Sequence, residues 1–235
     1  MVLNIDVAGR FLGRNVFDLY GMTVGKIVGI STDVKGIVTS LELELANGQF
    51  LNCPGEQIEI SGDHAVFFDD WRIQSKTLKV EMDISLKRIK ALSDLHRRGE
   101  IQPEIYEDLR KQHDANLSDL QRRMDALVKN LSVISRGMDG QLRHLEMFLA
   151  NNKMQLASGE IDGQSYKVAV DALERGLRRA LSGKKDVEAL LANLGGLKLG
   201  PEEPNPSQDT QLLPGNSSDY RDRIAAILSE SNQLS

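Results

Sequence analysis

Hydrophobic and polar residues follow three successive patterns along the 235 residues of this chain. The first pattern, from Val24 to Ile73, consists of short β-rich runs separated by turn residues. In "SLELELANG" the leucines at 41, 43 and 45 alternate with glutamates ahead of an Asn47-Gly48 turn signal. Strict alternation places the leucines on one face of a strand, so this run predicts a half-buried strand that enters a hairpin.

Further short runs on both sides of this hairpin indicate more strands. Glycines 25, 29 and 36 lie in or beside the runs, where glycine often marks a bulge or a tight bend. The spacing of turns predicts a small β-barrel over residues 1–78, closed by Trp71. The residues that supply the last two strands are Ile58, Ile60, Val66, Phe67 and Phe68.

At Lys79 the pattern changes to helical spacing, which continues to residue 195. One series of apolar residues is spaced alternately by 3 and 4, and this mean repeat of 3.5 is typical of a left-handed coiled coil. We expect these residues to mediate self-association. The series is Leu117, Leu120, Met124, Leu127, Leu131, Ile134 and Met138.

The same spacing recurs after a weak point. Gly137 and Gly140 each weaken a helix by about 1 kcal/mol relative to alanine, so a kink or a short break is predicted there. A further helix is predicted from Gly163, with a polar Lys184 interrupting its apolar stripe. Its residues assigned to self-association are Leu173, Leu177 and Leu191.

Two similar segments predict helical hairpin corners near 99–103 and 159–163. "RGEIQPEIYEDLR" and "SGEIDGQSYKVAV" align Gly99 with Gly159 and Tyr106 with Tyr166. In each, a helix ends at a glycine suited to a left-handed cap, and a new helix follows. The apolar stripe therefore has two interpretations, because a hairpin bundle within one chain would use it as fully as a second chain would.

The end of the chain combines a linker with an apolar stripe. Residues 196–218 hold four of the six prolines, which predicts a linker. Within 219–235, apolar residues fall on one face of a predicted helix that is too short to be stable alone in water. We therefore expect this disordered tail to bind a partner protein. The candidate partner-binding residues are Leu212, Leu213, Pro214, Tyr220, Ile224, Ile227 and Leu228.

Charge and composition narrow the remaining alternatives. Residues 81–198 hold 20 Lys and Arg against 18 Asp and Glu, whereas 199–235 hold 2 against 6. Contact of the middle with DNA or anionic lipid stays open, although this balance is typical of a solvated helical surface. A single cysteine, Cys53, and the absence of a signal or membrane-spanning pattern favour a cytoplasmic protein.

No arrangement of residues predicts catalysis, a cofactor or a metal. The four histidines are dispersed, and none is spaced from another histidine or from Cys53 as metal ligands are. "SGKKD" lacks the upstream glycine and the terminal Ser or Thr of a phosphate loop. The sequence is therefore that of an interaction protein and not of an enzyme.

The order of these parts resembles a known family. "VGKIVGISTDVKG", "ELANGQF" and "IEISGDHAVF" are similar to a PRC-barrel. A PRC-barrel followed by a long coiled coil, a Pro-rich linker and a terminal motif resembles the CdvA family of archaeal cell division proteins. This resemblance implies an α+β fold with a small N-terminal barrel, a helical coiled-coil region and a disordered C-terminal tail.

The resemblance also implies a function. Members of this family form filaments, associate with DNA and with the inner face of the membrane at mid-cell, and recruit the ESCRT-III-like protein CdvB through the C-terminal motif. The alternative is an adaptor in RNA or ribosome maturation, as other PRC-barrel proteins are. Membrane attachment of the tail is a third interpretation, against which Asp219, Asp222 and Glu230 offset Arg221 and Arg223.

Overall fold

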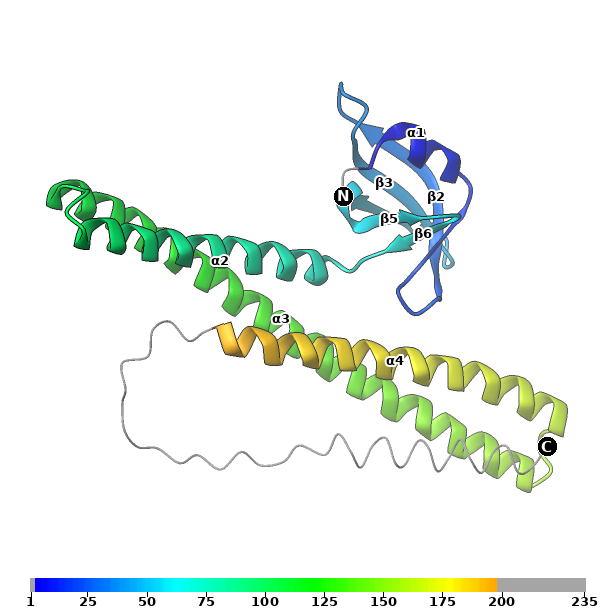
Figure 1. Ribbon diagram of the computed structural model, residues 1–235. Coiled ribbons are helices and arrows are strands. Elements are labelled where there is room, and N and C mark those ends of the chain that lie inside the picture. Colours follow the sequence, from blue (N-terminus) through cyan, green and yellow to red (C-terminus); the bar gives the residue numbers. More distant parts are fainter. Residues whose placement is uncertain (1–2, 198–235) are drawn as a thin grey trace, which may run out of the picture. The chain divides into compact units, whose positions relative to one another are not determined.

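The structure, a computed structural model, describes residues 3–197 as a six-stranded sheet followed by three long helices (Figure 1). This arrangement confirms the predicted α+β class. The candidate partner-binding residues of the tail lie outside the described residues. The elements are α1 (Ile5–Ala8), η1 (Gly9–Phe11), β1 (Asn15–Phe17), β2 (Thr23–Thr32), β3 (Val38–Leu45), β4 (Phe50–Pro54), η2 (Gly55–Gln57), β5 (Ile58–Ser61), β6 (His64–Phe67), α2 (Asp70–Arg97), α3 (Pro103–Ala157) and α4 (Gly163–Leu197).

The six strands form one sheet in the order β4-β3-β2-β1-β6-β5. All neighbouring strands are antiparallel except β1 and β6, which run parallel. Strand β4 pairs with β3 through the Asn47-Gly48 hairpin, as the alternating leucines predict. Strands β4 and β5 lie at opposite ends of this order, although only the short helix η2 separates them in the chain, so η2 turns the chain from one end of the sheet to the other.

One face of the sheet holds its own hydrophobic core. Leu41 and Leu43 are buried on β3 while Glu44 is exposed, which confirms the predicted alternation. Cys53 on β4 is also buried, and burial raises the pKa of its thiol to about 11. A thiol with such a raised pKa is a poor nucleophile, so Cys53 is a core residue.

The three long helices form two hairpins that share α3. The helix before each corner ends in a Schellman motif, in which Gly99 and Gly159 adopt φ angles of 74° and 77°. At the first, the Gly99 amide donates to the His96 carbonyl at 3.0 Å and the Glu100 amide to Leu95 at 3.0 Å. Figure 1 shows α2 packed along the first part of α3 and α4 along its later part. The predicted helical corners are thus present.

Two details differ from the sequence-based expectations. Helix α2 begins at Asp70, before the expected change at Lys79, and Trp71 packs in the helical core instead of closing the barrel. Helix α3 also runs from Pro103 to Ala157 without the predicted break at Gly137 and Gly140. Packing explains this continuity, because Leu131 and Leu142 on either side of the glycines are fully buried and hold the helix in place.

Candidate functional site: the helical core and its junction with the sheet

The ten residues expected to mediate self-association are buried or half-buried within the single chain. Where α2, α3 and α4 overlap, four of them are buried in one cluster with Trp71, Leu78 and Val187. Leu177 is buried elsewhere on α4, and Leu173 is half-buried. Of the two interpretations of the stripe, the structure shows the bundle within one chain. The four buried cluster members are Leu120, Met124, Leu127 and Leu131; the half-buried members are Leu117, Ile134, Met138 and Leu191.

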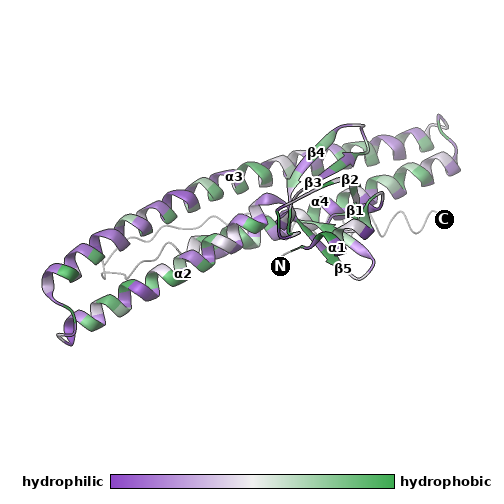
Figure 2. Ribbon diagram, turned by 90° about the horizontal axis from the view of Figure 1, so that it is seen from above, coloured by the Kyte–Doolittle hydropathy of each residue, from purple (hydrophilic) through white to green (hydrophobic). Residues whose placement is uncertain are grey.

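Helix α2 carries a matching apolar series that the sequence analysis missed. Its buried residues from position 71 to 85 are again spaced by 3 and 4, with Leu92 one heptad further on, although two of them are serines, Ser75 and Ser85. The serines and the expected barrel boundary at Lys79 concealed this pattern, but the spacing could have revealed it. Figure 2 shows hydrophilic and hydrophobic residues alternating along the long helices, as expected when each buries only one stripe. The series is Trp71, Ser75, Leu78, Met82, Ser85 and Leu92.

A polar network joins the sheet to the helices. The Tyr20 hydroxyl, in the turn after β1, donates to Asp186 on α4 at 2.8 Å. Arg72 on α2 donates to the same Asp186 oxygen at 2.7 Å and to the Tyr20 hydroxyl at 2.6 Å. Its guanidinium also lies 4.2 Å from the centre of the Trp71 ring, within the range of a cation–π interaction. Three parts of the chain therefore meet at one carboxylate.

The network shifts the proton affinities of its members. Burial and the hydrogen bond to Asp186 raise the pKa of Tyr20 above its usual value. Burial also acts to raise the pKa of Asp186, but hydrogen bonds from Arg72 and Tyr20 outweigh it and lower that pKa. The network therefore keeps a neutral phenol and a charged carboxylate, which is the pairing that its hydrogen bonds require.

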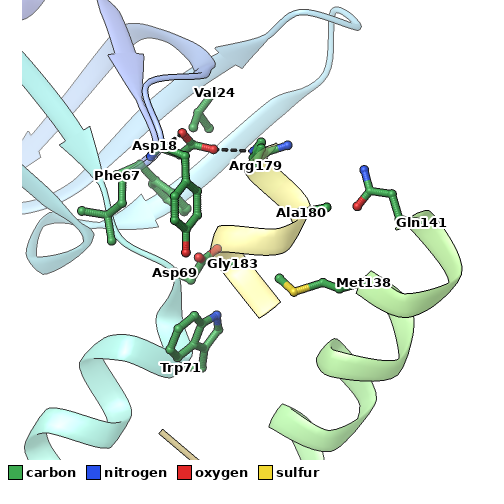
Figure 3. A pocket seen from close by; sticks show the side chains of 12 residues that line it. Asp18, Val24, Phe67, Asp69, Trp71, Met138, Gln141, Arg179, Ala180 and Gly183 are labelled. Atoms are coloured by element: carbon green, nitrogen blue, oxygen red, sulfur yellow. Dashed lines mark hydrogen bonds and ion pairs between the residues drawn. The ribbon is translucent and has the colours of Figure 1, made fainter. Parts of the chain in front are cut away.

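A second ion pair closes the other side of this junction. Arg179 on α4 donates from Nε to the Asp18 carboxylate at 2.6 Å (Figure 3). Asp18 is in turn held in place, since it accepts from the backbone amides of Tyr20 and Met22 at 2.9 and 2.8 Å. The sheet is thus attached to α4 at Asp18 as well as at Tyr20.

Between these contacts lies a cavity of about 220 Å³. Figure 3 shows Trp71, Met138 and Gln141 reaching it from α2 and α3. At Gly183 a Cβ atom would lie 3.0 Å from the Met138 terminal methyl and 3.6 Å from the Tyr20 hydroxyl, so glycine permits the close approach of α4. The cavity lies within a structural joint, between the Tyr20–Arg72–Asp186 network and the Asp18–Arg179 pair.

Lys184, the polar interruption of the α4 stripe, has a partner within the bundle. Its ammonium donates to Asp139 on α3 and lies 3.5 Å from Glu188. Burial acts to lower the pKa of Lys184, but these carboxylates outweigh it and raise the pKa, so the lysine stays charged. The interruption is therefore an ion pair between α4 and α3 at the level of the sheet junction.

Within residues 3–197, no cluster of His, Cys, Asp and Glu side chains is arranged to hold a metal ion. None of the helices in this part is both long and apolar enough to cross a membrane. The polar contacts of this site attach the sheet to a long helical bundle.

Comparison with known proteins identifies the family of this chain. A model of the CdvA-like coiled-coil domain matches residues 70–214, which begin at the first residue of α2. The chain belongs to the CdvA-like family. Cell division protein A of Sulfolobus acidocaldarius is 27% identical over 197 residues, which cover 84% of this chain and 82% of that relative.

The matched family region fits the elements of this CdvA-like protein. It contains α2, α3 and α4 in full and leaves the sheet on its N-terminal side. The alignment with the Sulfolobus relative is longer than the family region, which has 145 residues by its bounds. Family membership makes this chain a cell division protein, in agreement with the resemblance found in the sequence.

Proposed function

We propose that this CdvA-like protein is a non-enzymatic scaffold of cell division that assembles into filaments and recruits an ESCRT-III-like protein. The barrel domain and the helical region assemble, residues 196–218 serve as a linker, and residues 219–235 capture the partner. The observation that carries this proposal is the family match from α2 through Pro214. A cytoplasmic location at mid-cell follows from the same proposal.

The joint between the sheet and the helices supports a scaffold role. A protein that assembles through two domains needs those domains held in a fixed orientation, and Tyr20, Arg72 and Asp186 connect them directly. The long bundle gives each copy an extended surface for contacts along a polymer. Many tails on one filament would then bind a multivalent partner by avidity, which raises apparent affinity without new contacts.

Contact with DNA or membrane is a secondary part of this proposal. The cationic side chains of the helical region are mostly exposed, which suits a salt-sensitive contact with polyanions. The acidic balance of residues 199–235, 2 Lys and Arg against 6 Asp and Glu, disfavours the tail as the lipid-binding part. We therefore assign the tail to protein recruitment.

The recruitment proposal is tested with the full-length protein. Ile224→Asp with Leu228→Asp places two charges on the predicted apolar face, so it should abolish pull-down of the ESCRT-III-like protein from the same organism while assembly continues. Ala225→Asp with Ser229→Asp adds the same charge on the opposite face and should retain binding. Retained binding by the first variant, or loss by both, would contradict the assignment of Tyr220–Leu228 as the docking face.

A further inference from the structure

Helix α3 carries a second series of residues spaced by 4 and 3, on the side opposite the buried stripe. Val133, Met147 and Met154 in this series are 58%, 53% and 62% exposed. Leu131 and Gly140 are nine residues apart, which at 3.6 residues per turn is about half a revolution. The exposed members of this outer face are Val133, Gly137, Gly140, His144, Met147, Asn151 and Met154.

The outer face has the spacing of a coiled-coil seam but no covering within the described chain. Helices α2 and α4 both pack on the buried stripe, where Leu131 and Leu142 are fully buried. The outer series extends over about 32 Å, because 21 residues separate Val133 from Met154 at 1.5 Å per residue. A repeat of this length suits pairing with another long helix.

Two glycines create a shallow notch in this face. A Cβ atom added at Gly137 or Gly140 would meet nothing within 4 Å, so the single chain does not need glycine at either position. Both lie inside the continuous helix α3, where glycine is less favourable than alanine. A use for the open space arises when a second helix brings large side chains to it.

We propose that the outer face of α3 pairs with the same face of a second copy of this chain, in antiparallel orientation. The inference rests on the proposed function, which requires self-assembly, and it identifies the surface that performs it. In this register Met147 lies opposite Gly137 of the second copy, and His144 lies opposite Gly140. Each large side chain then fills the space above a glycine.

The same residues favour the antiparallel over the parallel orientation. In a parallel pair in register, Gly137 would face Gly137 and Gly140 would face Gly140, which leaves two adjacent layers without side chains to fill them. Empty layers lose packing contacts and are unfavourable. The antiparallel register removes both voids, because the glycines lie in the first half of the series and the large residues in the second.

Cations flank the outer face, so the salt dependence of binding distinguishes a second copy from a polyanion as its partner. Arg136 and Arg143 flank the series and are exposed. In a self-paired face these cations approach one another, so salt screens a repulsion and strengthens association. A nucleic acid or an anionic lipid on the same cations would instead be released by salt.

Cysteine cross-linking of the full-length protein tests the proposed register. Gly137→Cys and Met147→Cys are prepared separately, then mixed and oxidised; buried Cys53 is retained, and the unmodified chain is the control. In the antiparallel register each variant alone holds its two thiols about 15 Å apart along the axis, which is too far for a disulfide. The mixture should therefore give about tenfold more disulfide-linked dimer than either variant alone.

Each other outcome overturns the inference. Cross-linking of each variant with itself would show parallel pairing, and no cross-linking in protein that assembles by light scattering would show that assembly uses another surface. In that last case the proposed scaffold function stands while this inference fails. A full-length protein that stays monomeric would contradict both.

A second variant gives an independent readout. Gly140→Leu blocks the space for His144 of the second copy, whereas the open space at Gly140 accommodates leucine in the single chain. This variant should keep its thermal stability but lose assembly at high salt. Gln112→Leu, an exposed position on α3 before the outer face, should retain assembly. Equal assembly by both variants, or release of the unmodified assembly by salt, would overturn the inference.

Discussion

Arg72 and Asp186 lie 114 positions apart in the sequence, yet the Arg72 guanidinium donates to the Asp186 carboxylate at 2.7 Å. The same carboxylate accepts from Tyr20, so one oxygen joins the sheet region, the start of α2 and the middle of α4. The side chains of Arg72 and Asp186 are 20% and 41% exposed, so solvent screens the pair only in part. This network and the Asp18–Arg179 pair together attach the sheet to α4.

Removing the shared carboxylate should loosen the joint. We expect Asp186→Ala to lower the free energy of unfolding by about 1–2 kcal/mol, because Arg72 and Tyr20 lose a charged hydrogen-bond partner. Asp83→Ala, which removes an exposed pair with Lys87 on α2, should cost at most about 0.5 kcal/mol. Urea unfolding of both variants measures the difference, and equal losses would show that the junction contributes no more than a surface pair.

The joint also predicts a dependence on pH. Hydrogen bonds from Arg72 and Tyr20 outweigh burial and lower the pKa of Asp186 in the folded state, so the folded state binds this proton less readily than the unfolded state. The stabilisation is present above the unfolded pKa of about 4 and is lost as the pH falls through the folded pKa. Unfolding measured from pH 7 to pH 3 should show a steeper loss in the unmodified chain than in Asp186→Asn, and parallel curves would contradict this.

The two faces of α3 should respond differently to the same kind of truncation. Leu131 is fully buried, so Leu131→Ala should cost about 2–5 kcal/mol through lost burial and a new cavity. Val133→Ala, two residues further along, removes an exposed side chain and should change the stability of the single chain by at most about 0.5 kcal/mol. Dilute-protein calorimetry of both variants checks this contrast, and a large cost for Val133→Ala in monomeric protein would show that its face is covered within one chain.

Glycine-to-alanine substitutions should change the free energy of unfolding in opposite directions at the corner and within the helix. At Gly99 the φ angle of 74° strains any residue with a Cβ atom, so Gly99→Ala should cost about 1–2 kcal/mol. Gly137→Ala lies in open space within α3 and should stabilise the chain by up to about 1 kcal/mol. Thermal unfolding of dilute protein compares them, and a loss at both positions would indicate that Gly137 is constrained inside the single chain.

The sequence predicted those parts of the fold that depend on interactions between neighbouring residues. The α3 stripe, the two glycine corners and the β3 alternation depend on residues close in sequence, and each is present. The start of α2 was missed because Ser75 and Ser85 interrupt its apolar spacing. A kink or a short break was expected at Gly137 and Gly140; the break is absent, since tertiary packing outweighs the helix propensity of two residues.

The joint could not be predicted, because its members come from three distant segments. Tyr20, Arg72 and Asp186 carry no spacing signal in the sequence, and the packing of α2 and α4 on α3 brings them together. The sequence also left open whether the heptad stripe is covered by the same chain or by another. Within the described residues the same chain covers it, which leaves the outer face of α3 as the uncovered heptad series on that helix.

In the proposed function, the barrel and helical region assemble while the tail recruits the ESCRT-III-like protein. Light scattering with negative-stain microscopy, on the full-length chain and on a chain ending at Gly195, separates these two roles across a salt series. We predict large polymers from both proteins, because assembly belongs to the sheet and the helices. Small discrete species from both would contradict the scaffold and favour the adaptor in RNA or ribosome maturation.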